Sequence, residues 1–274
     1  MSDTSLCIGL CQLRTELEQS RTMEKAAAMV RAAAEQGAQI VALPEMYSTP
    51  YAPQYFREAL AQGHEQLTAA MSAWARDNGV VLVGGSVPER ADGKLYNTCF
   101  VFDRGGRQIA RHRKAHLFEV DLPDMRFSER RHFEEGREIT TFPTPWGTMG
   151  VAVCFDLRFP ELFRAMANRG ARVVFLPAQF NTVTGPAHWE LSLRARALDN
   201  EIFLAACSAA RYEGFSYECW GHSLVADPFG RVLREADETE QLLLCELDLA
   251  RIDEVRAQLP TFLHLRRELY AVAE

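Results

Sequence analysis

Short apolar runs that stop abruptly at proline or at a polar residue recur along the chain and predict buried β-strands. The run 39–43 stops at Pro44, and the run 149–154 ends at Cys154, after which Pro160 suits the first turn of a helix. Apolar residues at helical spacing predict amphipathic helices at 22–36, 66–77 and 184–199. The alternation of strands and helices indicates a mixed α/β fold.

One stretch of the chain repeats another. GAQIVALPE at 37–45 matches GARVVFLPA at 170–178, and each follows a strand and a helix. Those strands and helices are expected at 6–11 and 22–36 in the first half, and at 149–154 and 160–169 in the second. We therefore predict two related β-α-β halves whose equivalent strand ends lie close together, where open α/β sheets bind ligands.

Three reactive residues fall at predicted strand ends. Glu45 follows a first-half strand, Cys154 ends a second-half strand, and Lys114 follows the strand after the turn at 105–106. Each alone is ordinary, because free cysteines are often inert core residues and strand-end charges are usually solvated. Together they supply a thiol nucleophile, a base for its proton and a cation for an oxyanion.

Composition excludes several classes of partner. Hydrophobic residues make up 47% of the 274 residues, and the formal net charge of −7 opposes general affinity for nucleic acid. No apolar run is long enough to cross a bilayer, and the N-terminus lacks the features of a secretory signal. We expect a cytoplasmic protein without a membrane partner. No linker-like segment divides the chain, which predicts a single domain over 1–274.

Neither a disulfide framework nor a metal site is expected. The seven cysteines are odd in number and scattered, which predicts reduced thiols. Cys7 and Cys11 are four residues apart, roughly 13 Å along a strand, too far to share one zinc ion. Histidines that suggest a Cys-His dyad also fit local packing or hydrogen bonding; they are His112, His116, His188 and His222. We expect no metal and no cofactor.

The motifs around these residues resemble a known family. Glu45 in LPEMY, Lys114 in HRKAHLF and Cys154 in VAVCFDLRFPE resemble the Glu-Lys-Cys triad of the nitrilase superfamily of carbon-nitrogen hydrolases. WGHSLVADPFGRVL and LPTFLHLRRELYAV are similar to its omega-amidase branch, which cleaves the terminal amide of 2-oxoglutaramate and 2-oxosuccinamate. The resemblance spans nearly the whole chain and implies a four-layer α-β-β-α sandwich with two sheets packed face to face.

The resemblance also implies roles for individual residues. Glu45 would be the general base for attack by Cys154, and Lys114, with the backbone N–H of Phe155, would hold the oxyanion before a thioester forms and is hydrolysed. A second glutamate of the superfamily matches Glu129, whose role would be to position the lysine or the substrate. The alternative is an exposed acid that balances neighbouring arginines.

Two residues are candidates for binding the distal carboxylate of a monoamide substrate. Arg158 lies in the turn after the cysteine and can grip a carboxylate bidentately, while a salt bridge to Asp156 or Glu161 is equally open. Tyr51 matches a tyrosine of the omega-amidase pattern. The preceding EMYSTP departs from the Cys-Phe-Asn-Ser run common in that branch, so the pocket wall is expected to differ.

The sequence leaves alternatives open for both the oligomeric state and the activity of the protein. The superfamily implies a homodimer through the helix near 188–200 and the apolar tail 259–272, although that tail also suits folding back on its own subunit. Other candidate activities are those of a deaminated glutathione amidase, a carbamoylase or a nitrilase. A catalytically silent interaction protein is a further class, but silent relatives generally lose a triad member and this chain keeps all three.

Overall fold

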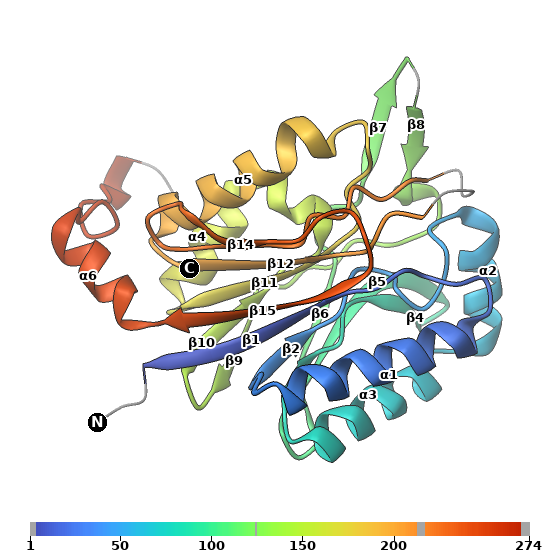
Figure 1. The fold of residues 1–274 in the computed structure, drawn as a ribbon. Helices are drawn as coiled ribbons and strands as arrows, with labels where there is room; N and C mark the ends of the chain where they lie inside the picture. Colours follow the sequence, from blue (N-terminus) through green and yellow to red (C-terminus); the bar gives the residue numbers. More distant parts are fainter. Residues whose placement is uncertain (1–3, 124, 213–216, 270–274) are drawn as a thin grey trace.

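The structure is a computed structural model that describes residues 4–123, 125–212 and 217–269, and two β-sheets form its centre (Figure 1). The strands of the first sheet are β1 (Ser5–Gln12), β2 (Ile40–Ala42), β3 (Val81–Val83), β4 (Val87–Ala91), β5 (Lys94–Phe102), β6 (Gln108–Arg113) and β15 (Gln241–Asp248). They pair in the order β15-β1-β2-β3-β5-β4, with β6 beside β5.

The second sheet has the order β14-β13-β12-β11-β10-β9. Its strands are β9 (Thr140–Thr144), β10 (Gly147–Val151), β11 (Val173–Ala178), β12 (Phe203–Ser208), β13 (Leu224–Ala226) and β14 (Val232–Glu235). A separate hairpin, β7 (Glu119–Leu122) and β8 (Met125–Ser128), projects from the body of the molecule (Figure 1).

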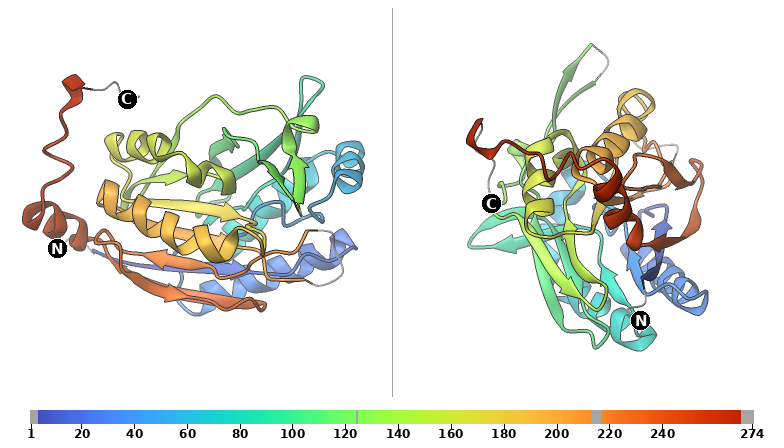
Figure 2. Two further views of the ribbon diagram at one scale, coloured as in Figure 1. Left: turned by 90° about the horizontal axis from the view of Figure 1, so that it is seen from above. Right: turned by 90° about the vertical axis from the view of Figure 1, so that its left-hand side faces the viewer.

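Helices cover both outer faces of the sheet pair (Figure 2). The α-helices of the described residues are α1 (Gln19–Glu35), α2 (Pro53–Gln62), α3 (Glu65–Asn78), α4 (Pro160–Asn168), α5 (Gly185–Asn200) and α6 (Ala250–Gln258). The helices α1 and α3 cover the first sheet, and α4 and α5 cover the second. The predicted α-β-β-α sandwich is confirmed, and α1, α3 and α5 match the three helices expected from periodicity.

The strand β2 shows how sequence alternation builds these layers. Ile40 and Ala42 belong to the core between the two sheets, whereas Val41 and Leu43 belong to the core beneath α1 and α3. Side chains alternate across a strand, so a run of apolar residues is buried on both faces. A continuous apolar strand is therefore what a central position in four layers requires.

The two predicted halves are present as parallel strand triplets. In the first sheet β1, β2 and β3 are parallel, and in the second β10, β11 and β12 are parallel. Parallel strands end at the same edge of a sheet. The carboxyl ends of β2 and β11 meet directly, because the backbone N–H of Gln179 donates to Oε2 of Glu45 at 3.0 Å.

One expected boundary is wrong. The strand β10 ends at Val151 and does not run into Cys154, which instead begins a 3₁₀ turn, η2 (Cys154–Arg158). The physical reason is the backbone of Cys154, whose φ of 47° lies in the left-handed region and cannot continue an extended strand. In the part of the chain that the structure describes, no helix combines the length and apolar character needed to span a membrane.

Candidate active site

Two carboxylates and one ammonium meet in the interior at the carboxyl edge of the first sheet. Glu45 follows β2, Lys114 directly follows β6, and Glu129 begins a 3₁₀ turn (Glu129–Arg131) after β8. The Nζ atom of Lys114 lies 2.8 Å from Oε1 of Glu45 and 2.7 Å from Oε2 of Glu129. All three side chains are completely buried. The expectation that Glu129 is an exposed acid is therefore excluded.

The backbone that carries Glu45 is held by the end of the neighbouring strand β3. The Ser86 hydroxyl accepts the N–H of Met46 at 3.0 Å, and the N–H of Ser86 donates to the carbonyl of Pro44 at 3.1 Å. Gly85 permits this approach, because a Cβ on it would lie 2.2 Å from that carbonyl oxygen and its φ is 63°. The position of Glu45 is thus set by main-chain contacts.

The charges in this cluster perturb one another. Burial opposes the charged form of Lys114, but the carboxylates of Glu129 and Glu45 outweigh it and raise the pKa of the ammonium. Burial raises the pKa of Glu45, with Lys114 opposing that shift and Glu129 adding to it. A permanently charged lysine therefore lies beside a carboxylate that is a stronger base than an ordinary glutamate.

The thiol of Cys154 completes this arrangement. It interacts with the carboxylate of Glu45, although the two residues are more than a hundred positions apart in the sequence. Burial and the charge of Glu45 raise its pKa well above the ordinary value, and Lys114 only partly opposes them. The resting group is a neutral thiol, which needs a base to become a nucleophile.

A narrow cleft opens at this thiol. Its lining residues are Phe118, Cys154, Phe155, Arg158, Gln179, Phe180, Asn181, Thr184 and Tyr217. Its volume is about 10 Å³, close to that of one water molecule, so a larger ligand has to displace lining side chains. Phe155 and Arg158, both candidates from the sequence, therefore border the nucleophile.

Arg158 has surroundings suited to a carboxylate. Its Nη1 lies 3.0 Å from Nδ1 of His188, and its guanidinium lies over the rings of Phe155 and Phe180 at 5.6 and 5.1 Å. Among residues 4–123, 125–212 and 217–269, no salt bridge involves Arg158. The carboxylate of Asp156, one of the alternatives from the sequence, instead faces His112 and His116.

Tyr51 points at the second glutamate. Its hydroxyl donates to Oε1 of Glu129 at 2.5 Å, and its ring packs against Phe127 and Tyr217 with centroid distances of 5.6 and 4.8 Å. The side chain is almost fully buried. Contact with a substrate carboxylate would therefore require the hydroxyl to leave Glu129.

Comparison with known proteins decides the family. The carbon-nitrogen hydrolase family model matches residues 7–257. The chain belongs to the carbon-nitrogen hydrolases. It is 42% identical over 270 residues to the Homo sapiens omega-amidase NIT2, covering 98% of both chains. It is similar to Saccharomyces cerevisiae Nit3, a member of branch 10 of the nitrilase superfamily, with 34% identity, a TM-score of 0.88 and 96% of both chains covered.

A more distant relative carries information on chemistry. The amidase from Nesterenkonia sp. is 27% identical with a TM-score of 0.79, over 96% of this chain and 95% of that one. A variant of that amidase shows covalent addition of the acetamide moiety of fluoroacetamide at its active-site cysteine. These relatives and the family model indicate that our carbon-nitrogen hydrolase is an enzyme that acts on amides.

The sequence analysis of this carbon-nitrogen hydrolase missed two polar residues of the site. Asn97 on β5 donates through Nδ2 to Oε1 of Glu45 at 2.8 Å and to Oε1 of Glu129 at 3.3 Å. Gln179 donates through its N–H and its Nε2 to Glu45. Gln179 directly follows the repeat that ends at Ala178, and Asn97 interrupts an apolar strand. Both features are visible in the sequence.

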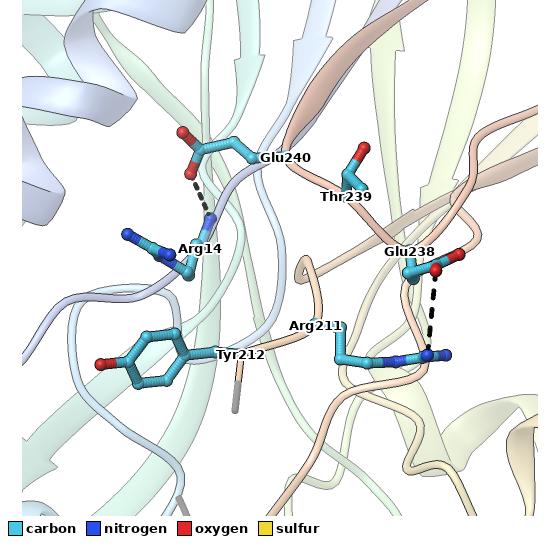
Figure 3. A pocket seen from close by; sticks show the side chains of 6 residues that line it. All are labelled: Arg14, Arg211, Tyr212, Glu238, Thr239 and Glu240. Atoms are coloured by element: carbon cyan, nitrogen blue, oxygen red, sulfur yellow. Dashed lines mark hydrogen bonds and ion pairs between the residues drawn. The ribbon is translucent and has the colours of Figure 1, made fainter. Parts of the chain in front are cut away.

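A surface cavity of about 490 Å³ lies elsewhere on this carbon-nitrogen hydrolase (Figure 3). It is lined by Arg14, Arg211, Tyr212, Glu238, Thr239 and Glu240. Both of its arginines already interact with glutamates: the side chain of Arg14 lies 3.2 Å from Glu16 and its backbone N–H donates to Glu240 at 2.7 Å, while Arg211 lies 4.0 Å from Glu238. None of the residues that line this cavity carries a thiol, unlike those of the small cleft. In the described ranges, no group of three His, Cys, Asp or Glu side chains is arranged to hold a metal ion.

Proposed function

We propose that this enzyme hydrolyses the terminal amide of small 2-oxo dicarboxylate monoamides, 2-oxoglutaramate and 2-oxosuccinamate, to the acid and ammonia through a thioester on Cys154. The observation that carries this proposal is the buried cluster in which Glu45 interacts with the Cys154 thiol while its carboxylate also receives the ammonium of Lys114. The similarity to proteins named omega-amidase supports the choice of substrate.

The first step is acylation. Glu45 takes the thiol proton as Sγ of Cys154 attacks the amide carbonyl carbon, and the carbonyl oxygen becomes an oxyanion. Protonation of Glu45 removes one of the two negative charges that hold Lys114, so the ammonium becomes available to the oxyanion. The backbone N–H of Phe155 is the second proposed donor. Losing one such donor typically costs about 3 kcal/mol of transition-state stabilisation.

The second step is release and hydrolysis. Protonated Glu45 gives its proton to the leaving nitrogen, the C–N bond breaks, and ammonia departs from a thioester. Glu45 then activates a water molecule that attacks the same carbon, and the thiol recovers its proton. Glu129 stays beside Lys114 throughout. Its negative charge holds the ammonium in place while Glu45 gains and loses the proton. The covalent adduct on the cysteine of the Nesterenkonia amidase indicates that the cysteine of that relative is nucleophilic.

Arg158 is the proposed partner of the distal carboxylate. It borders the same cleft as the thiol, and its one hydrogen-bonding side-chain partner, His188, carries no negative charge when its Nδ1 accepts. A carboxylate is a stronger partner for guanidinium than a neutral imidazole. The aromatic rings around Arg158 limit the room at the cleft, which favours small substrates.

We also propose a cytoplasmic homodimer. Leu191 and Leu198 lie seven residues apart on α5 and are 69% and 44% exposed. Exposed apolar side chains along one helix face favour burial against another protein surface, and a second copy of this chain supplies one. All seven cysteines are unpaired, which suits a reducing compartment.

The test is ammonia release from four substrates: 2-oxoglutaramate, a nitrile, a carbamoyl amino acid and deaminated glutathione. We expect the wild type to prefer 2-oxoglutaramate and Cys154→Ala to be inactive. Cys245→Ala is the matched control, because it removes another buried thiol on β15 and should keep full activity. Ammonia release from none of the four, or an active Cys154→Ala, would contradict the proposal.

A further inference from the structure

A second buried carboxylate lies beside the nucleophile and has four hydrogen-bond donors. Asp156 is completely buried, two residues after Cys154. Its Oδ2 receives the N–H of Val153 at 2.9 Å and Nε2 of His112 at 3.0 Å. Its Oδ1 receives the N–H of His116 at 2.9 Å and Nδ1 of the same residue at 2.8 Å. From the sequence, this carboxylate was only one of two alternatives for a salt bridge to Arg158.

Three of the four donors come from the segment that carries the catalytic lysine. His112 and His116 stand two residues before and two residues after Lys114, at the end of β6 in the first sheet. Asp156 belongs to the turn after β10 in the second sheet. One carboxylate therefore connects the lysine segment to the nucleophile turn across the two sheets, with a contact on each side of the lysine.

The same carboxylate closes the turn around a strained residue. Cys154 has a φ of 47°, a left-handed conformation that costs a non-glycine residue free energy and persists only where the surroundings impose it. Asp156 reaches back past Cys154 to the N–H of Val153. The direction in which the thiol points depends on this closure.

The donor groups are held in fixed orientations. The ring of His116 stacks on Phe159 with a centroid distance of 3.6 Å and an interplanar angle of 10°. The other ring nitrogen of His112 lies 3.0 Å from Oγ1 of Thr140. Burial alone would raise the pKa of Asp156, but hydrogen bonds from His112 and His116 hold it well below its usual range, so the carboxylate stays ionised and accepts at both oxygens.

We propose that Asp156 is a positioning residue that holds the Cys154 thiol and the Lys114 ammonium in one catalytic geometry, with His112 and His116 as its contacts to the lysine segment. This inference rests on the proposed roles of Cys154 and Lys114. The alternative is a carboxylate that contributes to folding alone. The two alternatives predict different results for a variant at temperatures at which it is fully folded. Loss of a positioning residue lowers kcat and the alkylation rate, whereas loss of a residue that contributes to folding alone leaves both unchanged.

Asp156→Asn is the decisive variant. Each carboxylate oxygen receives a backbone N–H, which cannot become an acceptor, so the amide group of asparagine opposes a donor in either orientation. We expect kcat for 2-oxoglutaramate to fall about 100-fold with KM within about 3-fold, because a small misplacement of reacting groups has that effect. The rate at which iodoacetamide alkylates Cys154, followed by mass spectrometry of its peptide, should fall about 10-fold.

A second variant tests the same inference if Asp156→Asn does not fold. His116→Phe keeps the ring that stacks on Phe159 and removes only the Nδ1 contact to Asp156. Its side chain is about one-third exposed, so folding is expected. We expect a smaller loss in kcat, about 5- to 10-fold, again with little change in KM.

The matched control is Asp227→Ala. Asp227 is also buried, and its Oδ1 receives the backbone N–H groups of Phe229 and Arg231 in a turn of the second sheet. It should lower the melting temperature and leave kcat and alkylation unchanged. If Asp156→Asn and His116→Phe alter kcat and alkylation no more than this control, the inference is overturned. If the wild type releases no ammonia, the proposed function fails, and the alkylation rates alone still decide the role of Asp156.

Discussion

The two β-α-β halves have the same strand order but contribute different chemistry. In the first half the end of β2 supplies the acid Glu45, whereas the end of β1 supplies Gln12, a buried amide bonded to backbone groups. In the second half the end of β10 leads to Cys154, whereas β11 ends at Ala178. Each half therefore contributes one reactive residue, at a different strand, and one structural residue. A repeated backbone determines where side chains meet, and their chemistry is decided position by position.

The variant Glu45→Gln is the strongest test of the chemical difference between the two halves. Glutamine keeps the shape and the contact between its backbone carbonyl and Nε2 of Gln179 but cannot accept the thiol proton. We expect kcat to fall about 10³- to 10⁴-fold, since general base catalysis contributes up to that factor. Steady-state ammonia release measures the change, and circular dichroism serves as the folding control. A variant with more than a tenth of wild-type activity would show that another group takes the proton.

Lys114→Met tests the residue that stands outside both triplets of parallel strands. Methionine fills similar space without charge, so the oxyanion loses its cation and kcat should fall about 10²- to 10³-fold. Glu45 and Glu129 are then left together without a counter-charge, so the pKa of Glu45 should rise further. The acid limb of the pH profile should move to higher pH, and an unmoved limb would contradict the arrangement.

The wild-type pH profile tests the first-half acid by itself. Burial raises the pKa of Glu45, so its basic form is lost at a higher pH than that of a free glutamate, about 4.3. As the pH falls through this raised pKa, kcat/KM should drop about tenfold per pH unit. The profile is measured by ammonia release in buffers of constant ionic strength. A limb at or below pH 4 would mean that Glu45 is not the base.

Tyr51→Phe tests the loop that follows β2 in the first half. The change removes one hydrogen bond to Glu129 and keeps the aromatic packing. We expect kcat to fall about 10-fold, which corresponds to about 1.5 kcal/mol, the lower limit for a single hydrogen bond to a charged group. The KM for 2-oxoglutaramate should stay constant. A selective rise in KM would instead place the hydroxyl on the substrate.

Gln12→Ala should have the smallest effect on activity. It removes bonds to the carbonyls of Asp237 and Thr239 and to the N–H of Ser223, and leaves these groups unsatisfied. We expect the free energy of unfolding to fall by about 2–3 kcal/mol, while kcat changes less than 2-fold. Urea denaturation and the ammonia assay measure the two quantities. A large loss of kcat without loss of stability would give β1 a chemical role.

Local patterns predicted much of the site because its reactive residues follow well-marked strands. Glu45 and Lys114 lie where the sequence placed them, and the repeat identified the edge at which the halves meet. Cys154 was found by its motif, although its strand ends three residues earlier. Asn97 and Gln179 were missed, although Asn97 interrupts an apolar strand and Gln179 directly follows the repeat, because only their partner, a carboxylate far away in the sequence, gives them a role in the site.

The resemblance to a known family implied the four layers, and the sequence by itself predicted the strands, the helices, the repeat and the candidate reactive groups, because periodicity is a local property of the chain. The tertiary structure decided their protonation and orientation. Whether Glu45 is a base, Lys114 a permanent cation and Asp156 the link between His112 and His116 depends on desolvation and on distances of about 3 Å. Those distances arise only when two sheets pack face to face and bring distant segments together.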